Sequence, residues 1–258
     1  MTDAERHEAL EAIAAEVRVC VKCRLHVGRT NAVPGEGNSS TEVMFVGEGP
    51  GFNEDRLGRP FVGRAGDFLV KLLGSIGWRR DEVFITNVVK CRPPDNRDPE
   101  PDEIAACAPY LRRQLEALDP ALVVTLGRYS MATFMPGARI SQAHGSVRPA
   151  DPASGGGNAL VFAMYHPAAA LRTTAIAATS LADMAGVPGA LLEARRRRSE
   201  ATVDVEATPS VAPVREPVPA AAAMGGRGRE TGAVATLLAP RPTLDAEETI
   251  PTDQMTLF

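Results

Sequence analysis

The sequence predicts an α/β fold in which helices cover both faces of a central four-stranded parallel sheet. Two observations lead to this expectation. Short apolar runs of strand length alternate with segments of helical periodicity, and turns that contain glycine or proline separate them. Alternating strands and helices form βαβ units, which place consecutive strands parallel and cover the sheet on both sides. With 258 residues, 44% of them apolar, the chain is long enough for one such three-layer α/β/α domain.

The elements can be placed in order along the chain. An amphipathic pattern over residues 4–18 predicts a first helix that runs into CVKC, and EVMFVG at 42–47 is a short apolar strand that ends in glycine. The same criteria predict the remaining elements, namely strands at 82–89, 121–127 and 160–166 and helices at 66–78, 101–118 and 128–135. In a parallel sheet, ligands bind at the carboxyl ends of the strands, where GEGPG (47–51), Asn87 and His166 fall.

The composition changes after the four arginines at 195–198. Residues 199–251 are rich in Ala, Pro, Val and Thr and have no sustained periodicity, which is typical of a disordered linker. The last residues then end in the apolar run QMTLF. We therefore expect a folded domain at 1–198, a disordered Ala/Pro-rich linker at 199–251 and a distinct terminal peptide at 252–258.

Charge and hydropathy narrow the possible compartments and partners. Residues 200–258 hold 9 acidic and 4 basic side chains, which leaves residues 1–199 with 24 basic and 23 acidic ones. The predicted domain is thus close to neutral, and a local basic face is compatible with it. There is no run of roughly eighteen or more apolar residues, and the N-terminal segment is charged, which argues against a membrane span and a secretory signal. We expect a cytoplasmic protein with reduced cysteines.

The four cysteines are the main candidates for a metal site. Cys20 and Cys23 form a C-x2-C pair, whereas Cys91 and Cys107 are separated by fifteen residues. A zinc ribbon would need two close pairs, so the second spacing counts against it. Four thiolates gathered from several elements can hold a [4Fe–4S] cluster. The spacing alone does not separate iron–sulfur from zinc, and four unrelated buried thiols are the third interpretation.

Several motifs together resemble one known family. GEGPG at 47–51, NEDRLGRPFVGRAG at 53–66, NVVKCRPP at 87–94 and YHPAAALR at 165–172 resemble the family 4 (iron–sulfur) uracil-DNA glycosylases, as does the cysteine pattern. The resemblance runs over roughly residues 10–190 and keeps the motifs in order. It implies an α/β/α glycosylase fold and a structural [4Fe–4S] cluster held by Cys20, Cys23, Cys91 and Cys107. It also implies excision of uracil from DNA, which leaves an abasic site for base excision repair.

Three polar residues suit the chemistry of that reaction. Cleavage of the N-glycosidic bond produces a cationic sugar and a uracil anion, after the base has been flipped out of the stack. Asn87 can accept from uracil N3–H and donate to O4, a pattern that cytosine reverses. His166 would donate to uracil O2, where leaving-group charge develops. Glu48 could position the attacking water and favour the cationic sugar.

The resemblance also implies roles for residues around the base. Gly49 would let the backbone approach uracil, Phe61 would stack on it, and Glu54 would lie near its C5 and help to exclude thymine. Leu171 of the AAALR segment could fill the gap left by the flipped base. The candidate DNA-contacting residues are Arg59, Arg64, Lys90, Leu171 and Arg172. No basic His-containing insert follows Asn87, so a hydrolytic enzyme is expected rather than one that traps DNA covalently.

The C-terminal peptide suggests a second partner. Gln254, Leu257 and Phe258 fit the Q-x-x-L-F pattern by which bacterial repair proteins dock on the sliding clamp, and a flexible tether would raise the local concentration of the enzyme at DNA. We expect a monomer that acts on uracil-containing DNA, single- or double-stranded. The alternative function is a non-catalytic iron–sulfur module that binds DNA or accompanies a polymerase.

Overall fold

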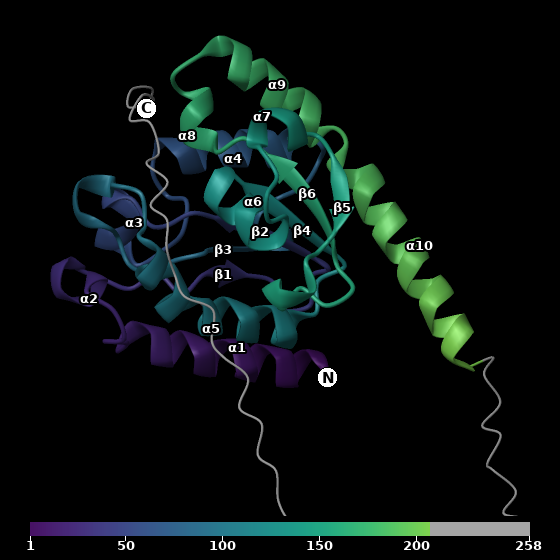
Figure 1. Cartoon of the computed structure of the whole chain (residues 1–258), viewed down its shortest axis with the longest axis horizontal. Coiled ribbons are helices and arrows are strands. Elements are labelled where there is room, and N and C mark those ends of the chain that lie inside the picture. The colour runs from purple at the N-terminus through teal and green to yellow at the C-terminus, as the bar shows by residue number, and fades with distance from the viewer. Residues whose placement is uncertain (207–258) are drawn as a thin grey trace, which may run out of the picture. The chain divides into compact units, whose positions relative to one another are not determined.

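A six-stranded mixed sheet forms the centre of residues 1–206, the part of the chain that the computed structural model describes (Figure 1). The strand order is β1-β3-β2-β4-β6-β5. The four inner strands are parallel to one another, and the edge strands β1 and β5 pair antiparallel with β3 and β6. The strands are β1 (Glu36–Gly37), β2 (Val43–Gly47), β3 (Phe84–Asn87), β4 (Leu122–Leu126), β5 (Val147–Pro149) and β6 (Leu160–Met164).

Helices occupy both faces of this sheet. In chain order they are α1 (Asp3–Arg18), α2 (Leu25–Gly28), α3 (Phe52–Leu57), α4 (Arg64–Ser75), α5 (Pro101–Leu118), α6 (Arg128–Phe134), α7 (Ile140–Ala143), α8 (Pro167–Ala170), α9 (Thr174–Met184) and α10 (Val187–Glu206). Three short 3₁₀ turns lie at Arg80–Glu82, Pro94–Asn96 and Pro152–Ser154. The expected three-layer α/β/α arrangement around four parallel strands is confirmed.

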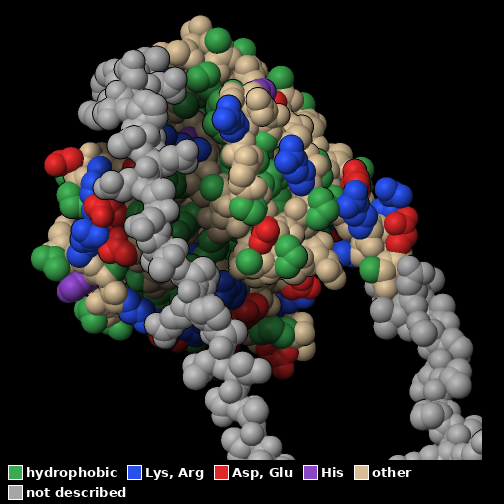
Figure 2. Space-filling model, in the orientation of Figure 1, with side chains coloured by type: hydrophobic (Ala, Val, Ile, Leu, Met, Phe, Trp, Pro, Cys, Tyr) green, Lys and Arg blue, Asp and Glu red, His purple; other side chains and the backbone are tan. Residues whose placement is uncertain are grey.

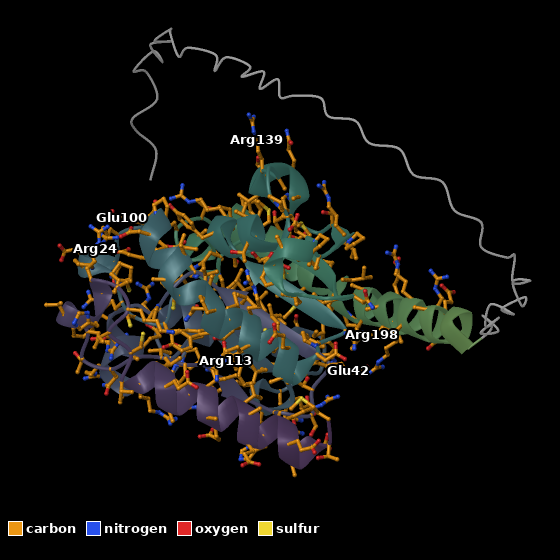
Figure 3. The ribbon with its side chains drawn as sticks, turned by 60° about the horizontal axis from the view of Figure 1, so that its bottom comes forward. Arg24, Glu42, Glu100, Arg113, Arg139 and Arg198 are labelled. Atoms are coloured by element: carbon orange, nitrogen blue, oxygen red, sulfur yellow. The ribbon has the colours of Figure 1, made fainter. Side chains whose placement is uncertain are left out.

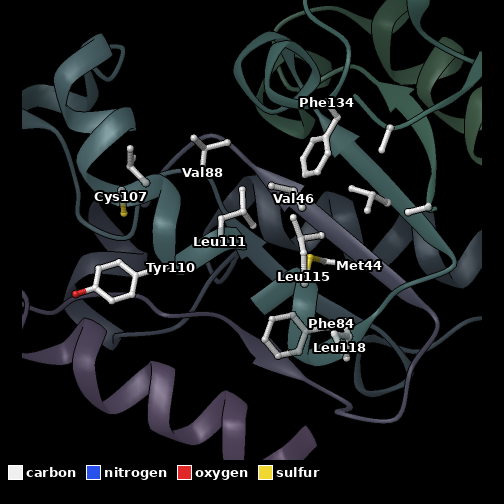
Figure 4. Packing of buried hydrophobic residues seen from close by; sticks show 14 of the residues in the cluster. Met44, Val46, Phe84, Val88, Cys107, Tyr110, Leu111, Leu115, Leu118 and Phe134 are labelled. Carbon is white, nitrogen blue, oxygen red and sulfur yellow. The ribbon is translucent and has the colours of Figure 1, made fainter. Parts of the chain in front are cut away.

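Alternating side chains on the strands divide the core into two clusters. Met44 and Val46 of β2 face one side, where they join the buried residues of α1, α5 and α6. Val43 and Phe45 of the same strand face the other side, where α4, α9 and α10 pack. This follows from the two-residue period of a strand. Figure 4 shows part of the first cluster, in which Leu111, Leu115 and Leu118 of α5 approach the sheet.

Helices α1 and α5, which pack in the first cluster, both begin at capping boxes. Thr2 and Glu5 form a capping box at the start of α1, and Glu100 and Glu103 form one at the start of α5. Such caps satisfy amide groups that the first helical turn leaves unpaired. Arg113 of α5 then reaches Glu16 of α1 at 2.6 Å, so the two helices are joined along their length as well as through the core (Figure 3).

The sequence prediction missed the two edge strands. β1 has two residues and β5 has three, and none of these five residues is buried. Strands this short carry too few residues to show an apolar period, so only their pairing with β3 and β6 identifies them. The six helices α2, α3 and α7 to α10 were also not predicted, and most of them span only one or two turns.

The boundary predicted at residue 198 is wrong, because α10 continues to Glu206. An ion pair one helical turn apart spans the predicted boundary and supports this extension, at 3.2 Å between Arg196 and Glu200. Arg198 also reaches Asp119 at 2.9 Å, which joins the helix to the loop before β4. The rest of the predicted linker and the terminal peptide with Gln254, Leu257 and Phe258 lie outside the described residues.

The segment Thr174–Ala201, which combines α9 with most of α10, is long and apolar enough to cross a membrane by length and composition alone. In the described fold it contributes Met184, Val187, Ala190, Leu191 and Ala194 to the second core cluster, and 28% of its most apolar window is buried. These five residues pack in the core of the described fold, and one such helix is weak support for a membrane span.

Candidate active site

The carboxyl ends of β2 and β3 lie side by side and bring their terminal residues together. Gly47 is in register with Asn87, and Val88 N–H donates to Gly47 O at 2.9 Å just beyond the paired residues. Gly47 has no room for a side chain, because a Cβ there would overlap the Asn87 amide and lie 2.6 Å from Cζ of Phe61. Only glycine lets the amide and the aromatic ring approach the strand end this closely.

Asn87 is the most unusual polar residue at this edge. Its side chain is 1% exposed, and its Oδ1 has no hydrogen-bond partner among the described residues. An unpaired buried acceptor costs about 1–3 kcal/mol, and natural proteins rarely keep one without a reason. A buried acceptor at the carboxyl end of a parallel strand is suited to a ligand that donates a hydrogen bond, as uracil N3–H does.

Lys90 does not contact DNA in the way the sequence predicted. It is 1% exposed, and its Nζ donates to Thr86 Oγ1 at 2.6 Å, to Asn87 O at 2.7 Å and to Gln114 Oε1 at 2.7 Å. Burial lowers the pKa of its ammonium to about 8. The prediction was wrong because a lysine after a strand is usually a surface charge. Here its hydrogen bond to Asn87 O fixes the backbone of Asn87, and the other two hydrogen bonds fix the ammonium group.

Phe61 lies in the loop between α3 and α4, and Glu54 is a residue of α3. Phe61 is buried, and its ring centroid is 5.7 Å from that of His166. Glu54 Oε1 accepts from the backbone N–H groups of Val62 and Gly63, both at 2.9 Å. The aromatic ring predicted to stack on uracil therefore lies beside the predicted O2 donor, and one Glu54 oxygen holds the loop that carries this ring.

His166 follows β6 and forms the N-cap of α8. Its Nδ1 accepts from the N–H of Ala168 at 3.1 Å, so the proton of the neutral ring is on Nε2. Burial lowers the pKa of His166 to about 4, which keeps the ring neutral near pH 7. The residue can therefore donate one hydrogen bond through Nε2–H without carrying a charge.

Glu48 lies immediately beyond the Gly47–Asn87 pair and is half-buried. Burial, together with the nearby carboxylate of Asp98, raises the pKa of Glu48 to about 7, while Arg128 opposes that rise. Arg128 is itself hydrogen-bonded to Asp98. A carboxyl group with a pKa near neutrality can take up or release a proton during a reaction at physiological pH.

The other predicted contact residues are on the surface or at its edge. Gly49 is half-buried against Val89, and Arg64 is the exposed first residue of α4. Leu171 and Arg172 are exposed in the turn between α8 and α9, directly after the segment that follows His166. Arg59 is exposed but is already paired with Glu36 at 2.7 Å.

All four cysteines line one pocket between α1, the segment after β3 and α5. They are free thiols, and no three His, Cys, Asp or Glu side chains in residues 1–206 are grouped closely enough to hold a single metal ion. The ligands of a four-iron cube bind different iron atoms and so do not converge on one point. Three sulfurs accept N–H groups, from Lys22 N to Cys20, from Lys90 N to Cys107 and from Arg29 Nη1 to Cys91.

The donor chemistry of this pocket fits an iron–sulfur cluster. Burial raises the pKa of Cys91, and it raises that of Cys107 to about 11, so without a metal these thiols stay protonated. Thiolate ligands of a cluster are stabilised by N–H donors of the kind seen at three of the sulfurs. Arg24, which follows Cys23, also reaches Glu100 and Asp102 at the start of α5, both at 2.8 Å, and so ties the first cysteine pair to the helix that bears Cys107 (Figure 3).

Comparison with known proteins identifies the family. The uracil DNA glycosylase superfamily profile matches residues 34–183. The type-4 uracil-DNA glycosylase of Saccharolobus solfataricus is 54% identical over 166 residues, which cover 63% of this chain and 77% of that protein. Those of Sulfurisphaera tokodaii and Archaeoglobus fulgidus are 51% and 48% identical over 170 and 169 residues, with 64% of this chain and 76% and 84% of the relatives covered. The chain belongs to the type-4 uracil-DNA glycosylases.

The superfamily match spans the whole sheet but begins after Cys20 and Cys23. Family resemblance and sequence reasoning together found the residues at the strand ends. They missed Arg80, which donates to Phe61 O, and Asp98 and Arg128, which shift the pKa of Glu48 in opposite directions. No sequence signal marks these three. Arg80 and Asp98 occur in charged segments, Arg128 begins α6 just after β4, and the partner of each is distant in the chain.

Proposed function

We propose that this type-4 family member excises uracil from DNA by hydrolysis of the N-glycosidic bond and leaves an abasic site. The observation that carries the proposal is the buried, unpartnered Oδ1 of Asn87. Uracil N3–H would satisfy this acceptor, whereas cytosine N3 is itself an acceptor and would leave both groups unpaired. Such a mismatch in a buried site can discriminate by several orders of magnitude.

His166 stabilises the leaving group in this proposal. As the bond between the sugar C1′ and uracil N1 breaks, its electron pair moves into the base and negative charge develops on O2. The Nε2–H of His166 donates to O2, because Nδ1 is committed to Ala168 N–H. A preorganised neutral donor of this kind stabilises developing charge without a proton transfer.

Glu48 completes the hydrolysis. In its carboxylate form it orients a water molecule towards C1′ and accepts one proton from it, so that hydroxide is transferred to the sugar and uracil leaves as its anion. The negative carboxylate also favours the cationic sugar of the transition state. The pKa of about 7 makes this proton uptake feasible at neutral pH.

The DNA contacts follow from the positions of the exposed residues. Leu171 lies at the tip of the turn after α8 and would occupy the space left by the flipped nucleotide, with Arg172 beside it for phosphate. Arg64 at the start of α4 would contact the DNA phosphate backbone. Arg59 would do so only if its ion pair with Glu36 were broken. Glu54 would exclude the thymine methyl group from the vicinity of Phe61.

The Asn87→Ala variant tests the recognition step. Loss of the amide should lower the single-turnover rate on uracil-containing DNA by about 100-fold or more, as for removal of a key hydrogen-bonding group in a buried site. Asn158→Ala, in the exposed turn before β6, is the matched control and should cleave at the wild-type rate. Equal rates for the two variants would remove Asn87 from the mechanism.

We also propose that Cys20, Cys23, Cys91 and Cys107 hold a [4Fe–4S] cluster, which would cross-link α1, the segment after β3 and α5 when bound. The shared pocket and the N–H groups directed at three sulfurs support this assignment. Anaerobically purified protein should contain about four iron atoms and absorb in the visible range. Cys91→Ser should lose both iron and thermal stability, and a variant with a full iron content would refute the ligand assignment.

Finally, we propose that Gln254, Leu257 and Phe258 dock the chain on a bacterial sliding clamp. The support is the Q-x-x-L-F pattern alone. Clamp affinity should be lost in the full-length protein with Gln254→Ala, Leu257→Ala and Phe258→Ala combined, while uracil excision from short oligonucleotides stays unchanged. Equal clamp affinity of the variant and the wild type would contradict the proposal.

A further inference from the structure

Phe61 has a backbone conformation that aromatic residues seldom adopt. Its φ is 48°, in the left-handed region, where bulky side chains are disfavoured. The other non-glycine residues with positive φ within residues 1–206 are Asp and Asn, which tolerate this region well. Strained residues persist only where the surrounding structure holds them, and they concentrate at ligand-binding sites.

Arg80 holds the carbonyl side of this strained residue. Its Nη1 donates to Phe61 O at 2.9 Å, and its Nη2 donates to Pro60 O. Nε and Nη2 of the same guanidinium also donate to Glu36 Oε1, at 3.1 Å and 2.9 Å. One side chain thus fixes two consecutive carbonyls of the loop and is itself fixed by a carboxylate of β1.

Two further contacts hold the loop from the other side. Glu54 Oε1 accepts the N–H groups of Val62 and Gly63, the two residues that follow Phe61. In α4, Gly66 packs against the Phe61 carbonyl so closely that a Cβ there would overlap it. The ring itself lies over Gly47 and beside His166. The loop is therefore held at its carbonyls by Arg80, at its amides by Glu54 and from behind by α4.

We propose that Arg80 is a positioning residue for uracil stacking, which acts by holding Phe61 in its left-handed conformation, with Glu36 orienting the guanidinium. The inference rests on the proposed excision of uracil and names how the stacking ring of that site is kept in place. Arginine suits the task because its planar fork presents several donors in fixed directions, whereas lysine offers one flexible ammonium. Arg80 does not touch the base.

A double-mutant cycle in the full-length protein tests this role. Single-turnover rates and apparent dissociation constants are measured on uracil-containing DNA for Arg80→Ala, Phe61→Ala and the combined variant. Arg80→Ala should lower the rate at sub-saturating enzyme about 10- to 100-fold, which corresponds to about 1.4–2.7 kcal/mol of lost transition-state stabilisation. In the Phe61→Ala background the same substitution should change the rate by less than about threefold, because the ring it positions is absent.

Arg79→Ala is the matched control, since the neighbouring Arg79 is exposed and forms ion pairs with Asp81 and Glu82 of the same turn rather than with the Phe61 loop. It should cleave at the wild-type rate.

The Arg80→Lys variant keeps the charge beside Glu36 and is the control for misfolding. It should keep a folded circular dichroism spectrum and still lose most of the rate. A purely structural role predicts equal effects of Arg80→Ala with and without Phe61, or restoration by lysine, and either result would overturn the inference. Absence of excision by the wild-type protein would instead reject the proposed function.

Discussion

Three side chains at the strand ends acquire their chemistry from where the fold places them. Burial leaves Asn87 Oδ1 without a partner in the described part of the chain, which costs about 1–3 kcal/mol until a donor arrives. Burial also moves the pKa values of Glu48 and His166 in opposite directions, to about 7 and about 4. The carboxyl group becomes a proton acceptor that works near neutrality, and the imidazole becomes a neutral hydrogen-bond donor.

The pH dependence of the reaction follows from these two values. In the proposed mechanism Glu48 must be ionised to orient water, so the single-turnover rate should fall about tenfold for each pH unit below 7 and should level off above it. His166 should add no step between pH 5 and 9, because it is already neutral throughout that range. A rate profile over this range checks the expectation.

The variant Glu48→Gln provides the control for this profile. It should be slow and independent of pH, since its side chain does not titrate. A wild-type rate that stays constant between pH 5 and 9 would show that ionisation of Glu48 does not limit the reaction.

At the scale of elements, the segment after β3 joins Asn87 to the cysteine pocket. Asn87 ends the strand, Lys90 is buried beneath it, and Cys91 follows in the pocket lining. Lys90 links both parts, because its Nζ donates to Asn87 O and its backbone N–H donates to Cys107 Sγ at 3.3 Å. A disturbance of the cysteine pocket is therefore expected to reach the Asn87 amide, which we propose recognises uracil.

The Lys90→Met variant measures the strength of this link. It would remove the donor that Thr86 Oγ1, Asn87 O and Gln114 Oε1 share, although Gln114 Oε1 keeps a hydrogen bond from Thr86 Oγ1 at 3.3 Å. Each group left unsatisfied costs about 1–3 kcal/mol, partly offset because a buried charge is removed. The thermal midpoint should fall by roughly 5–15 °C. The control Lys71→Met, on the exposed face of α4, should melt within about 2 °C of wild type. Equal midpoints for both variants would mean that the Lys90 network contributes little.

At the scale of the whole molecule, the sequence predicts the parts that depend on local pattern. The four parallel strands and the helices α1, α4, α5 and α6 were predicted within a few residues, because their apolar periods are long enough to recognise. The edge strands β1 and β5 were not, because pairing with a distant strand creates them. Lys90 and Arg80 show the same limit, since their burial and partners depend on tertiary contacts that a local pattern does not contain.

The surface agrees with the near-neutral charge of the folded part. On the face shown in Figure 2, basic and acidic side chains are interspersed rather than gathered by sign. Many arginines are paired, as Arg59 is with Glu36 and Arg113 with Glu16. Binding to DNA is therefore expected to rest on the flipped base and a few phosphate contacts, with a shallow dependence on salt concentration.

The most direct test of the account is the release of free uracil by the purified full-length protein. Oligonucleotides that differ only in one uracil, thymine or cytosine are incubated with excess enzyme, and free base and alkali-labile sites are quantified together. The account predicts one uracil and one abasic site for each uracil-containing strand, with no base released from the thymine or cytosine strands. Absence of uracil release, or equal release of thymine or cytosine, would contradict it.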